Sequence, residues 1–196
     1  MGKGDNTRQF IIEKSAELFK VNGYNGCSLS DIMKATQLKK GGIYNHFNNK
    51  DEIALEAFEY SLKRIIKRFR AKLDHDKTST QKLFSIIEVM CEMVDDGGCP
   101  IYNAAVDSLD THPLLQKHAK KGMDTLKDYI EIKIKEGKEN GEFKPDADSV
   151  EISSILMVTL EGALIMSRIQ KNKKHLNIAV NFLHKYLNEK LIINAD

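Results

Sequence analysis

The sequence predicts an all-α protein in which a short N-terminal unit precedes a larger helical body. Apolar residues recur at three- and four-residue spacing through most of the 196 residues, and this is the period of an amphipathic helix. No stretch alternates apolar and polar residues as a half-buried strand does, and no internal repeat or low-complexity tract is present. A polar stretch at residues 74–80 marks the expected boundary between the two parts.

The first expected helix covers residues 6–22, where Ile12, Ala16 and Phe19 share one face. Residues 23–26, which include two glycines, end this helix. Residues 27–50 then read as two short helices joined by a tight polar turn, which is a helix-turn-helix arrangement. Ser28 or Ser30 is the expected cap of the first. The expected inward-facing residues are Ile32 and Ala35 on the first helix and Leu38, Ile43 and Phe47 on the second.

Two adjacent glycines, Gly41 and Gly42, interrupt the second of these helices. Each costs about 1 kcal/mol relative to alanine inside a helix, so a purely structural helix would rarely use both. Glycines do allow a backbone to approach another surface closely. The residues from Lys39 to Asn45 span about 10 Å along a helix, which suits a major groove about 12 Å wide. DNA is therefore the expected surface.

The same stretch resembles the tetracycline-repressor (TetR) family of bacterial regulators. The residues that carry the resemblance are Asp31-Ile32, then Lys40-Gly41-Gly42-Ile43-Tyr44-Asn45-His46-Phe47, then Lys50-Asp51-Glu52-Ile53. Members of the family usually carry glycine or a small residue where Gln37 stands and serine where Lys39 stands. The resemblance implies a three-helix DNA-binding domain, closed by the helix at residues 6–22, and a ligand-binding and dimerisation body.

The resemblance and the helix geometry together imply roles for individual residues. Gly42 and Asn45 would lie nearest the base edges, since asparagine can pair bidentately with adenine. Phosphate contacts are expected from Lys40, Tyr44, His46 and Lys50, although Tyr44 and His46 could instead pack within the domain. The predicted DNA-binding residues are Ser28, Lys39, Lys40, Gly41, Gly42, Tyr44, Asn45, His46 and Lys50. Arg8 could also contact the DNA backbone or could simply be solvated.

Charge and periodicity divide the chain further. Residues 1–50 hold eight Lys or Arg against four Asp or Glu, as a polyanion-binding module would, whereas the whole chain carries only +2. A long connecting helix is expected at residues 51–73, and its basic outer face reads as a solvated surface. The predicted domains are residues 1–50 for DNA binding, 51–73 as a connector, and 74–196 for effector binding and dimerisation.

The body is expected to contain five further helices. One begins near Leu83 and stops at the glycines 97 and 98, and the next starts at Pro100, which favours a first helical turn and leaves Cys99 at the cap. The segment after Cys99 again resembles a branch of the family in which this helix lines the effector cavity. A third helix follows His112-Pro113, and the stretch Asp146-Ala147-Asp148 is expected to cap the fourth, which is the most apolar.

The helix within residues 147–170 has an apolar face that is too wide for one partner, and residues 174–190 form a final amphipathic helix. Residues 147–170 and 174–190 are therefore expected to pack against their copies in a second subunit, which makes the protein a homodimer. The most apolar run, residues 155–166, is interrupted by Glu161 and is too short to cross a bilayer of about 30 Å. No membrane association is predicted.

A small-molecule effector is expected in the body, because helical bundles build cavities from apolar side chains with a few polar groups. The candidates are Met90, Met93, Cys99, Tyr102, Asn103, Met123, Met157 and Glu161. Plain core packing is the alternative for the methionines. Glu161 is more specific because a buried carboxylate needs a partner, which could be a ligand cation, another subunit or water.

Enzyme chemistry has no signature in the chain, so we expect no catalytic residues. There is no nucleophile elbow, phosphate loop, zinc-protease motif or dinucleotide fingerprint. Three cysteines form no paired framework or metal pattern, so neither metal nor cofactor is expected, and a reducing cytoplasm is the expected location. The polar N-terminus also lacks the apolar core of an export signal.

The predicted function is a ligand-responsive repressor that binds a palindromic operator as a dimer. An effector in the body would move the connecting helix and change the separation of the two DNA-binding units, as the resemblance implies. One alternative is a regulator switched by a protein partner or by oxidation of Cys99, whose thiolate a helix start would stabilise; a small buried cysteine is the plain reading. Another is a helical binding protein with a vestigial DNA-binding unit.

Overall fold

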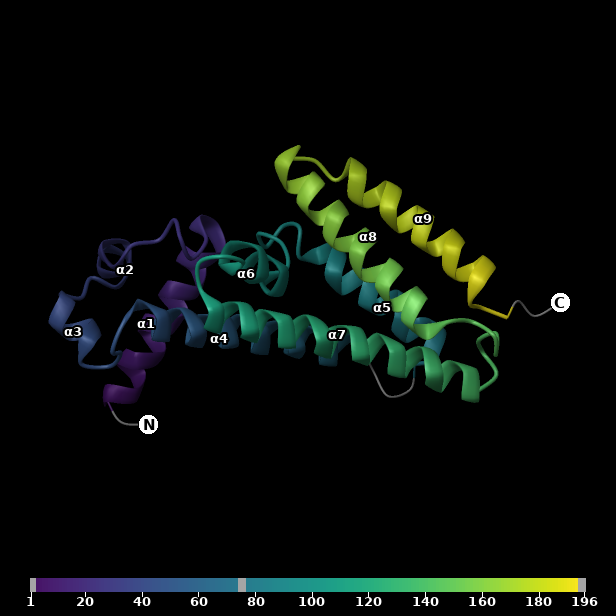
Figure 1. Cartoon of the computed structure of the whole chain (residues 1–196), viewed down its shortest axis with the longest axis horizontal. Helices are drawn as coiled ribbons and strands as arrows, with labels where there is room; N and C mark the ends of the chain where they lie inside the picture. Colours follow the sequence, from purple (N-terminus) through teal and green to yellow (C-terminus); the bar gives the residue numbers. More distant parts are fainter. Residues whose placement is uncertain (1–2, 74–76, 194–196) are drawn as a thin grey trace. The chain divides into compact units, whose positions relative to one another are not determined.

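A computed structural model describes residues 3–73 and 77–193, and over these residues the chain folds into nine helices (Figure 1). The helices are α1 (Lys3–Asn22), α2 (Leu29–Thr36), α3 (Lys40–Tyr44), α4 (Lys50–Lys72), α5 (Ser79–Glu92), α6 (Pro100–Ser108), α7 (Pro113–Glu139), α8 (Ser149–Ile169) and α9 (Lys174–Lys190). Outside the helices, the described residues add one isolated antiparallel bridge, between Phe143 and Ile192. The all-α prediction is confirmed.

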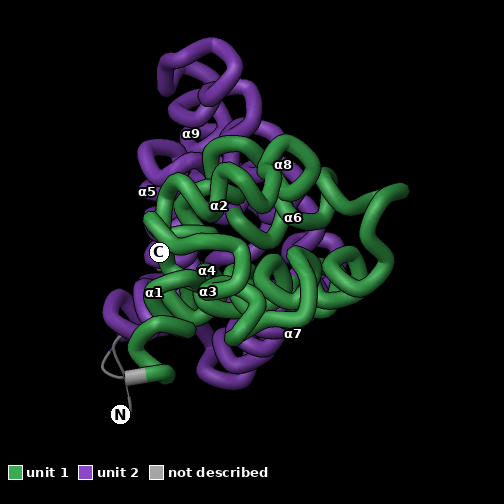
Figure 2. Tube along the Cα trace, turned by 90° about the vertical axis from the view of Figure 1, so that its left-hand side faces the viewer, with its two compact units in different colours: residues 1–66, 100–122 green, residues 67–99, 123–196 purple. Residues whose placement is uncertain are grey.

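The chain divides into two compact units, which Figure 2 colours separately. Unit 1 comprises residues 1–66 and 100–122, and unit 2 comprises residues 67–99 and 123–196. Helices α4 and α7 therefore contribute residues to both units. The functional boundaries predicted after residues 50 and 73 stay predictions. Of the polar break predicted at 74–80, residues 74–76 lie outside the described residues, and α5 already begins at Ser79.

Unit 1 is built on an apolar core that α1, α2, α3 and the start of α4 share. The buried core residues are Ile11, Ile12, Cys27, Ile32, Ile43, Phe47 and Ile53. Ile43 and Phe47 are buried as predicted, and Leu38 packs against them at the edge of this core. Ala35 is only partly buried. Thr36 is the buried neighbour, and its hydroxyl donates to the Ile32 carbonyl at 2.7 Å, which satisfies the polar group inside the core.

Local capping explains where α2 begins and ends. Ser28 is the N-cap, which settles the predicted choice between Ser28 and Ser30: its hydroxyl accepts from the Asp31 N–H, and the Asp31 carboxylate accepts from the Ser28 N–H. Gln37 ends the helix with φ 61°, in the left-handed region. Glycine adopts this conformation without steric cost, which gives a physical reason for the family preference at this position.

Helix α6 and the first turns of α7 complete unit 1. Pro100 starts α6 as predicted, because the first turn of a helix does not need its missing N–H. The two helices approach closely at Gly122, where an added Cβ would lie 3.3 Å from the Ile101 side chain. A larger residue at Gly122 would push the helices apart.

Unit 2 holds α5, the later part of α7, and the helix pair α8 and α9. Helices α8 and α9 lie side by side in Figure 1 and run antiparallel, joined by a short turn. Within the capping stretch predicted at residues 146–148, Asp148 is the N-cap of α8 and accepts the N–H groups of Val150 and Glu151. The start of α5 is held by the Glu142 carboxylate, which accepts the N–H groups of Ser79 and Thr80 at 2.8 and 2.9 Å.

Helix α8 is long and apolar enough to cross a membrane by length and composition alone. The prediction that this segment is too short to cross a bilayer therefore does not hold, because the helix covers Ser149–Ile169 and is longer than the apolar run at residues 155–166. Half of the most apolar 18-residue stretch of the helix is buried inside the protein, including Leu156, Leu160 and Leu164.

Candidate nucleic-acid interface

The second helix of the predicted DNA-binding motif is short and is anchored from one side. Helix α3 contains five residues, and Ile43 and Phe47 fix it to the core of unit 1. Its other side carries polar and basic groups. The residues of this face that are exposed are Lys39, Lys40, Gly41, Tyr44 and Asn45, while Gly42 and His46 are partly exposed. Seven of the nine predicted DNA-binding residues therefore lie together on α3 and its ends.

Among the residues that the structure describes, no neighbour requires either position of the α3 pair to be glycine. A Cβ added to Gly41 would meet nothing within 4 Å. A Cβ added to Gly42 would meet only the Leu38 side chain, at an ordinary contact distance of 3.7 Å. Both glycines also have ordinary negative φ angles, so no backbone conformation demands them. At these two positions no side chain covers the helix backbone on its outer surface.

Tyr44 and His46 differ in exposure. The Tyr44 ring is 39% exposed, and the Lys40 ammonium lies 5.7 Å from its centre. These two side chains form one accessible cationic and hydrogen-bonding edge of α3. His46 is only partly exposed, so the alternative of packing within the domain fits His46 better than Tyr44.

Ser28 and Lys50 have contacts inside the domain as well as their predicted contacts with DNA. The Ser28 hydroxyl donates to the Asp31 carboxylate at 2.6 Å and belongs to the α2 cap. The Lys50 ammonium donates to the carbonyls of Tyr24 and Cys27 at 2.8 and 2.6 Å. It also lies 4.0 Å from the centre of the Tyr24 ring. Two of the three donors of the Lys50 ammonium are therefore used within unit 1, and its contact with a phosphate stays a prediction.

Arg8 is held inside unit 1. Its guanidinium pairs with the carboxylates of Glu52, at 3.0 Å, and Glu56, and it lies 4.4 Å from the centre of the Phe47 ring. The hydrogen bond to Glu56 raises the pKa of Arg8. These contacts join α1 to α4, so the sequence reading of a freely solvated arginine is wrong.

The predicted effector residues divide between the two units. Tyr102 and Asn103 belong to unit 1, and the other six belong to unit 2. Met90 and Met93 are buried in unit 2 with exposures of 0% and 2%, as core methionines are. Met123 and Met157 are partly exposed.

Glu161 and Cys99 meet inside unit 2. The Glu161 side chain is buried, and the Cys99 thiol makes a hydrogen bond to its carboxylate. Burial raises the pKa of Glu161 to about 7, and the thiol contact offsets part of that effect. The carboxyl group therefore changes charge near neutral pH. From the sequence, a buried carboxylate here is expected to need a partner, and the Cys99 thiol is a contact of this kind.

The other two cysteines are poor nucleophiles. Burial raises the pKa of the Cys27 thiol, and burial together with Glu88 and Glu92 raises that of Cys91 to about 11. The structure contains no disulfide among the described cysteines. Within residues 3–73 and 77–193, no three His, Cys, Asp or Glu side chains come together as metal ligands.

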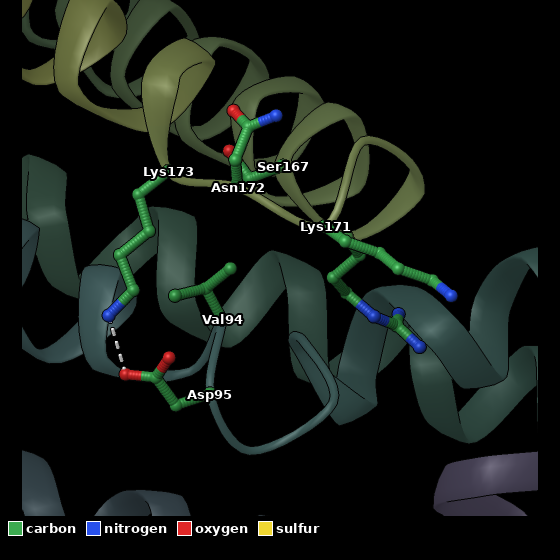
Figure 3. Close-up of a pocket in the computed structure, with 7 residues that line it drawn as sticks. Val94, Asp95, Ser167, Lys171, Asn172 and Lys173 are labelled. Atoms are coloured by element: carbon green, nitrogen blue, oxygen red, sulfur yellow. Dashed lines mark hydrogen bonds and ion pairs between the residues drawn. The ribbon is translucent and has the colours of Figure 1, made fainter.

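Unit 2 contains a polar cavity that the sequence did not indicate (Figure 3). It has a volume of about 330 Å³ and lies between the end of α5 and the turn joining α8 to α9. The lining residues are Val94, Asp95, Ser167, Arg168, Lys171, Asn172 and Lys173. Lys173 closes one side by pairing with Asp95 at 2.7 Å. None of the predicted effector residues lines it. Its lining residues come from two segments far apart in the sequence, residues 94–95 and residues 167–173, so no periodic pattern in the sequence indicates it.

A helix-turn-helix with an exposed basic second helix, carried with a larger set of helices, defines the class of DNA-binding transcription regulators. The family described as "Bacterial regulatory proteins, tetR family" matches residues 11–57. The family described as "Tetracyclin repressor-like, C-terminal domain" matches residues 79–183. The chain belongs to the TetR family, whose members are transcriptional regulators and not enzymes.

Individual relatives agree with this assignment. The HTH-type transcriptional repressor DhaR of Mycobacterium sp. is 25% identical over 87% of this chain and 86% of its own length. The HTH-type transcriptional regulator QacR of Staphylococcus aureus is 23% identical over 93% and 97%. The crystal structure of a TetR transcriptional regulator from Chloroflexus aurantiacus superposes with a TM-score of 0.94 at 33% identity, covering 99% of this chain and 100% of that one.

Proposed function

We propose that the protein is an effector-responsive repressor that binds a near-palindromic operator as a dimer. The observation that carries the proposal is the glycine pair of α3, which serves no packing or conformational need within the described part of unit 1. Gly41 and Gly42 would let the α3 backbone approach the floor of a major groove. Asn45 would then read a base edge, and Lys39, Lys40 and Tyr44 would contact phosphates.

A second copy of the chain is the proposed partner of α8 and α9. Helix α8 exposes Val158, Met166 and Ile169, and α9 exposes Ile178 and Phe182. The exposed fractions of Val158 and Ile169 are 74% and 67%, which is unusual for large apolar side chains at helical spacing. A symmetric dimer through residues 147–170 and 174–190 would cover both faces. It would also present two α3 helices to successive major grooves.

The proposed effector binds in the helical body, and Glu161 is its best-supported contact. A ligand group that donates hydrogen bonds or carries positive charge would stabilise the ionised carboxylate, whose donor among the described residues is the weak thiol of Cys99. The thiol-switch alternative fits less well. Cys99 is 3% exposed and lies beside a carboxylate whose charge opposes thiolate formation. The proposed location is the cytoplasm, where the DNA is.

DNA binding is tested first, with a duplex selected from a random library by the wild-type protein. The logarithm of its affinity should fall linearly with the logarithm of salt concentration, as counterion release requires. Replacing Lys40→Ala should lower affinity for selected and random duplexes alike and reduce the salt slope by about 1. Replacing Asn45→Ala should instead relax base preference at one position by about 1–3 kcal/mol. If the wild-type protein shows no salt-dependent binding, the proposal fails.

A further inference from the structure

The turn between α1 and α2, residues Gly23–Gly26, is held by the start of α4. The Lys50 ammonium donates to the Tyr24 carbonyl at 2.8 Å and lies over the Tyr24 ring. The Tyr24 hydroxyl donates to the Asp51 carboxylate. Burial and Asp51 both raise the pKa of Tyr24, so its hydroxyl stays a donor at physiological pH. The turn is therefore fixed to the DNA-binding core on this side.

The same turn is held from a second side by the corner between α6 and α7, residues Asp107–His112. The Asp107 carboxylate accepts the N–H groups of Tyr24 and Asn25, the latter at 3.1 Å. In return, the Asn25 side-chain amide donates to the Asp107 carbonyl at 2.8 Å and to the Thr111 hydroxyl at 3.1 Å. The corner and the turn thus bind each other through reciprocal hydrogen bonds, two of which use a charged acceptor.

The backbone conformation at Gly23 permits this approach. Gly23 has φ +72°, which L side chains rarely adopt. A Cβ at Gly23 would also lie 3.0 Å from an Asp107 carboxylate oxygen, which is closer than real Cβ contacts usually come. The turn is therefore shaped to receive Asp107 as well as to end α1.

His112 closes the space between the two sides. Its ring is 5% exposed and meets the Tyr24 ring edge to face at 4.7 Å between centres. Its Nδ1 accepts the Leu115 N–H at 3.0 Å and so caps α7. Its Nε2 lies 3.5 Å from the Asp51 carboxylate, too far for a hydrogen bond. Tyr24 is thus packed between the start of α4 and the start of α7.

We infer that Asp107 is a positioning residue for DNA binding, and this inference rests on the proposed function. Asp107 transmits the position of the α6–α7 corner to the α1–α2 turn. The turn leads within two residues to Ser28, the cap of α2, so it sets where the helix-turn-helix begins. Residues 100–122 fall inside the C-terminal family match at 79–183, yet they form one compact unit with residues 1–66. A displacement of the corner must move the turn or break these hydrogen bonds.

The test compares three variants with the wild-type protein. Asp107→Leu keeps the approximate shape and removes both acceptors, whereas Asp107→Asn keeps an oxygen that can accept the two N–H groups. Asp110→Leu removes the same charge from an exposed position three residues further along the corner. The probes are the duplex selected by the wild-type protein and a random duplex of the same length. Hydrogen exchange at the Tyr24 and Asn25 amides reports whether the contact is broken.

We expect Asp107→Leu to speed exchange at both amides and to weaken binding of the selected duplex by roughly tenfold. Binding of the random duplex should change much less, because phosphate contacts of α3 do not need the register of α2. Asp107→Asn should restore the selected-duplex affinity, and Asp110→Leu should match the wild-type protein in both measurements. Faster exchange with unchanged selected-duplex affinity would show that Asp107 only caps the turn, and the inference would be wrong.

Folding failure would not hide the answer. If Asp107→Leu does not fold, Asn25→Ala removes the reciprocal donors and leaves the Asp107 carboxylate and the two backbone N–H groups in place. It should weaken selected-duplex binding in the same direction by a smaller factor, and no change would overturn the inference. If the wild-type protein selects no duplex, the proposed function itself is wrong. If wild-type and variant proteins bind the selected duplex equally, only the inference about Asp107 is wrong.

Discussion

At the scale of single residues, Gln37 shows a stability cost at the DNA-binding unit. It adopts φ 61° at the end of α2, where a Cβ is disfavoured. We expect Gln37→Gly to raise the free energy of unfolding by about 0.5–1 kcal/mol, measured by urea denaturation. Lys171→Gly is the matched control, since Lys171 has φ 50° in the turn after α8 and should respond in the same direction. Destabilisation by both would contradict this reading of the two turns.

Glu161 gives a pH-dependent prediction at the same scale. Its folded pKa of about 7 lies above the ordinary value of 4.5, so the folded state holds a proton that the unfolded state releases between those values. The contribution of Glu161 to stability is therefore complete at low pH and is lost as pH rises towards 7. Glu161→Gln should be neutral near pH 4.5 and stabilising by on the order of 1–3 kcal/mol at pH 8.

The difference in unfolding free energy between Glu161→Gln and the wild-type protein is the quantity to plot against pH, because other titrations cancel in it. Glutamine keeps an oxygen that can accept the Cys99 thiol, so packing changes little. A difference that does not vary with pH would mean that Glu161 is ionised in the folded state with a partner still to be found.

At the scale of elements, α3 has few interactions of its own that stabilise a helical conformation. It has five residues, and its N-cap Lys39 makes no side-chain cap hydrogen bond. Gly41→Ala should increase the free energy of unfolding by about 1 kcal/mol and so raise the midpoint of thermal unfolding, because alanine favours a helix more than glycine does. The added Cβ would meet nothing within 4 Å. The same variant should bind the selected duplex more weakly because the new methyl group occupies the groove-facing surface. Stronger folding with unchanged binding would remove the reason for the glycine pair.

Elements fixed by local chemistry were predictable from the sequence. The start at Pro100 and the buried Ile43 and Phe47 follow from spacing or from neighbours within four residues. The caps were predicted to within a few residues, as Ser28 or Ser30 for α2 and as the stretch 146–148 for α8, and the structure selects Ser28 and Asp148. The missed contacts have another origin: Arg8 pairs with Glu52, and Asp107 with Tyr24, across 44 and 83 residues. Such pairs leave no period in the chain, because either partner alone reads as an ordinary surface charge. The hydrogen bonds of Lys50 to the Tyr24 and Cys27 carbonyls, across 26 and 23 residues, are hidden in the same way, and its contact with DNA stays a prediction.

At the scale of the whole molecule, the exposed apolar faces of α8 and α9 predict how the DNA-binding units are paired. Phe182 is 52% exposed in a single chain, so Phe182→Glu opens no cavity and should leave the helical signal and urea midpoint of the isolated subunit unchanged. In a symmetric dimer the charge would be buried twice, and dissociation should follow, as measured by sedimentation equilibrium.

DNA binding links that dimer to the proposed operator. A monomer presents one α3 instead of two, so the Phe182→Glu protein should bind the selected duplex far more weakly than the wild-type protein does. Its affinity for a single half-site should equal that of one wild-type subunit. Asn188→Glu places the same charge on an exposed position of α9 away from the apolar face and should remain dimeric. A Phe182→Glu protein that stays dimeric and binds DNA normally would mean that the subunits pair through another surface, and that the exposed faces of α8 and α9 meet a different partner.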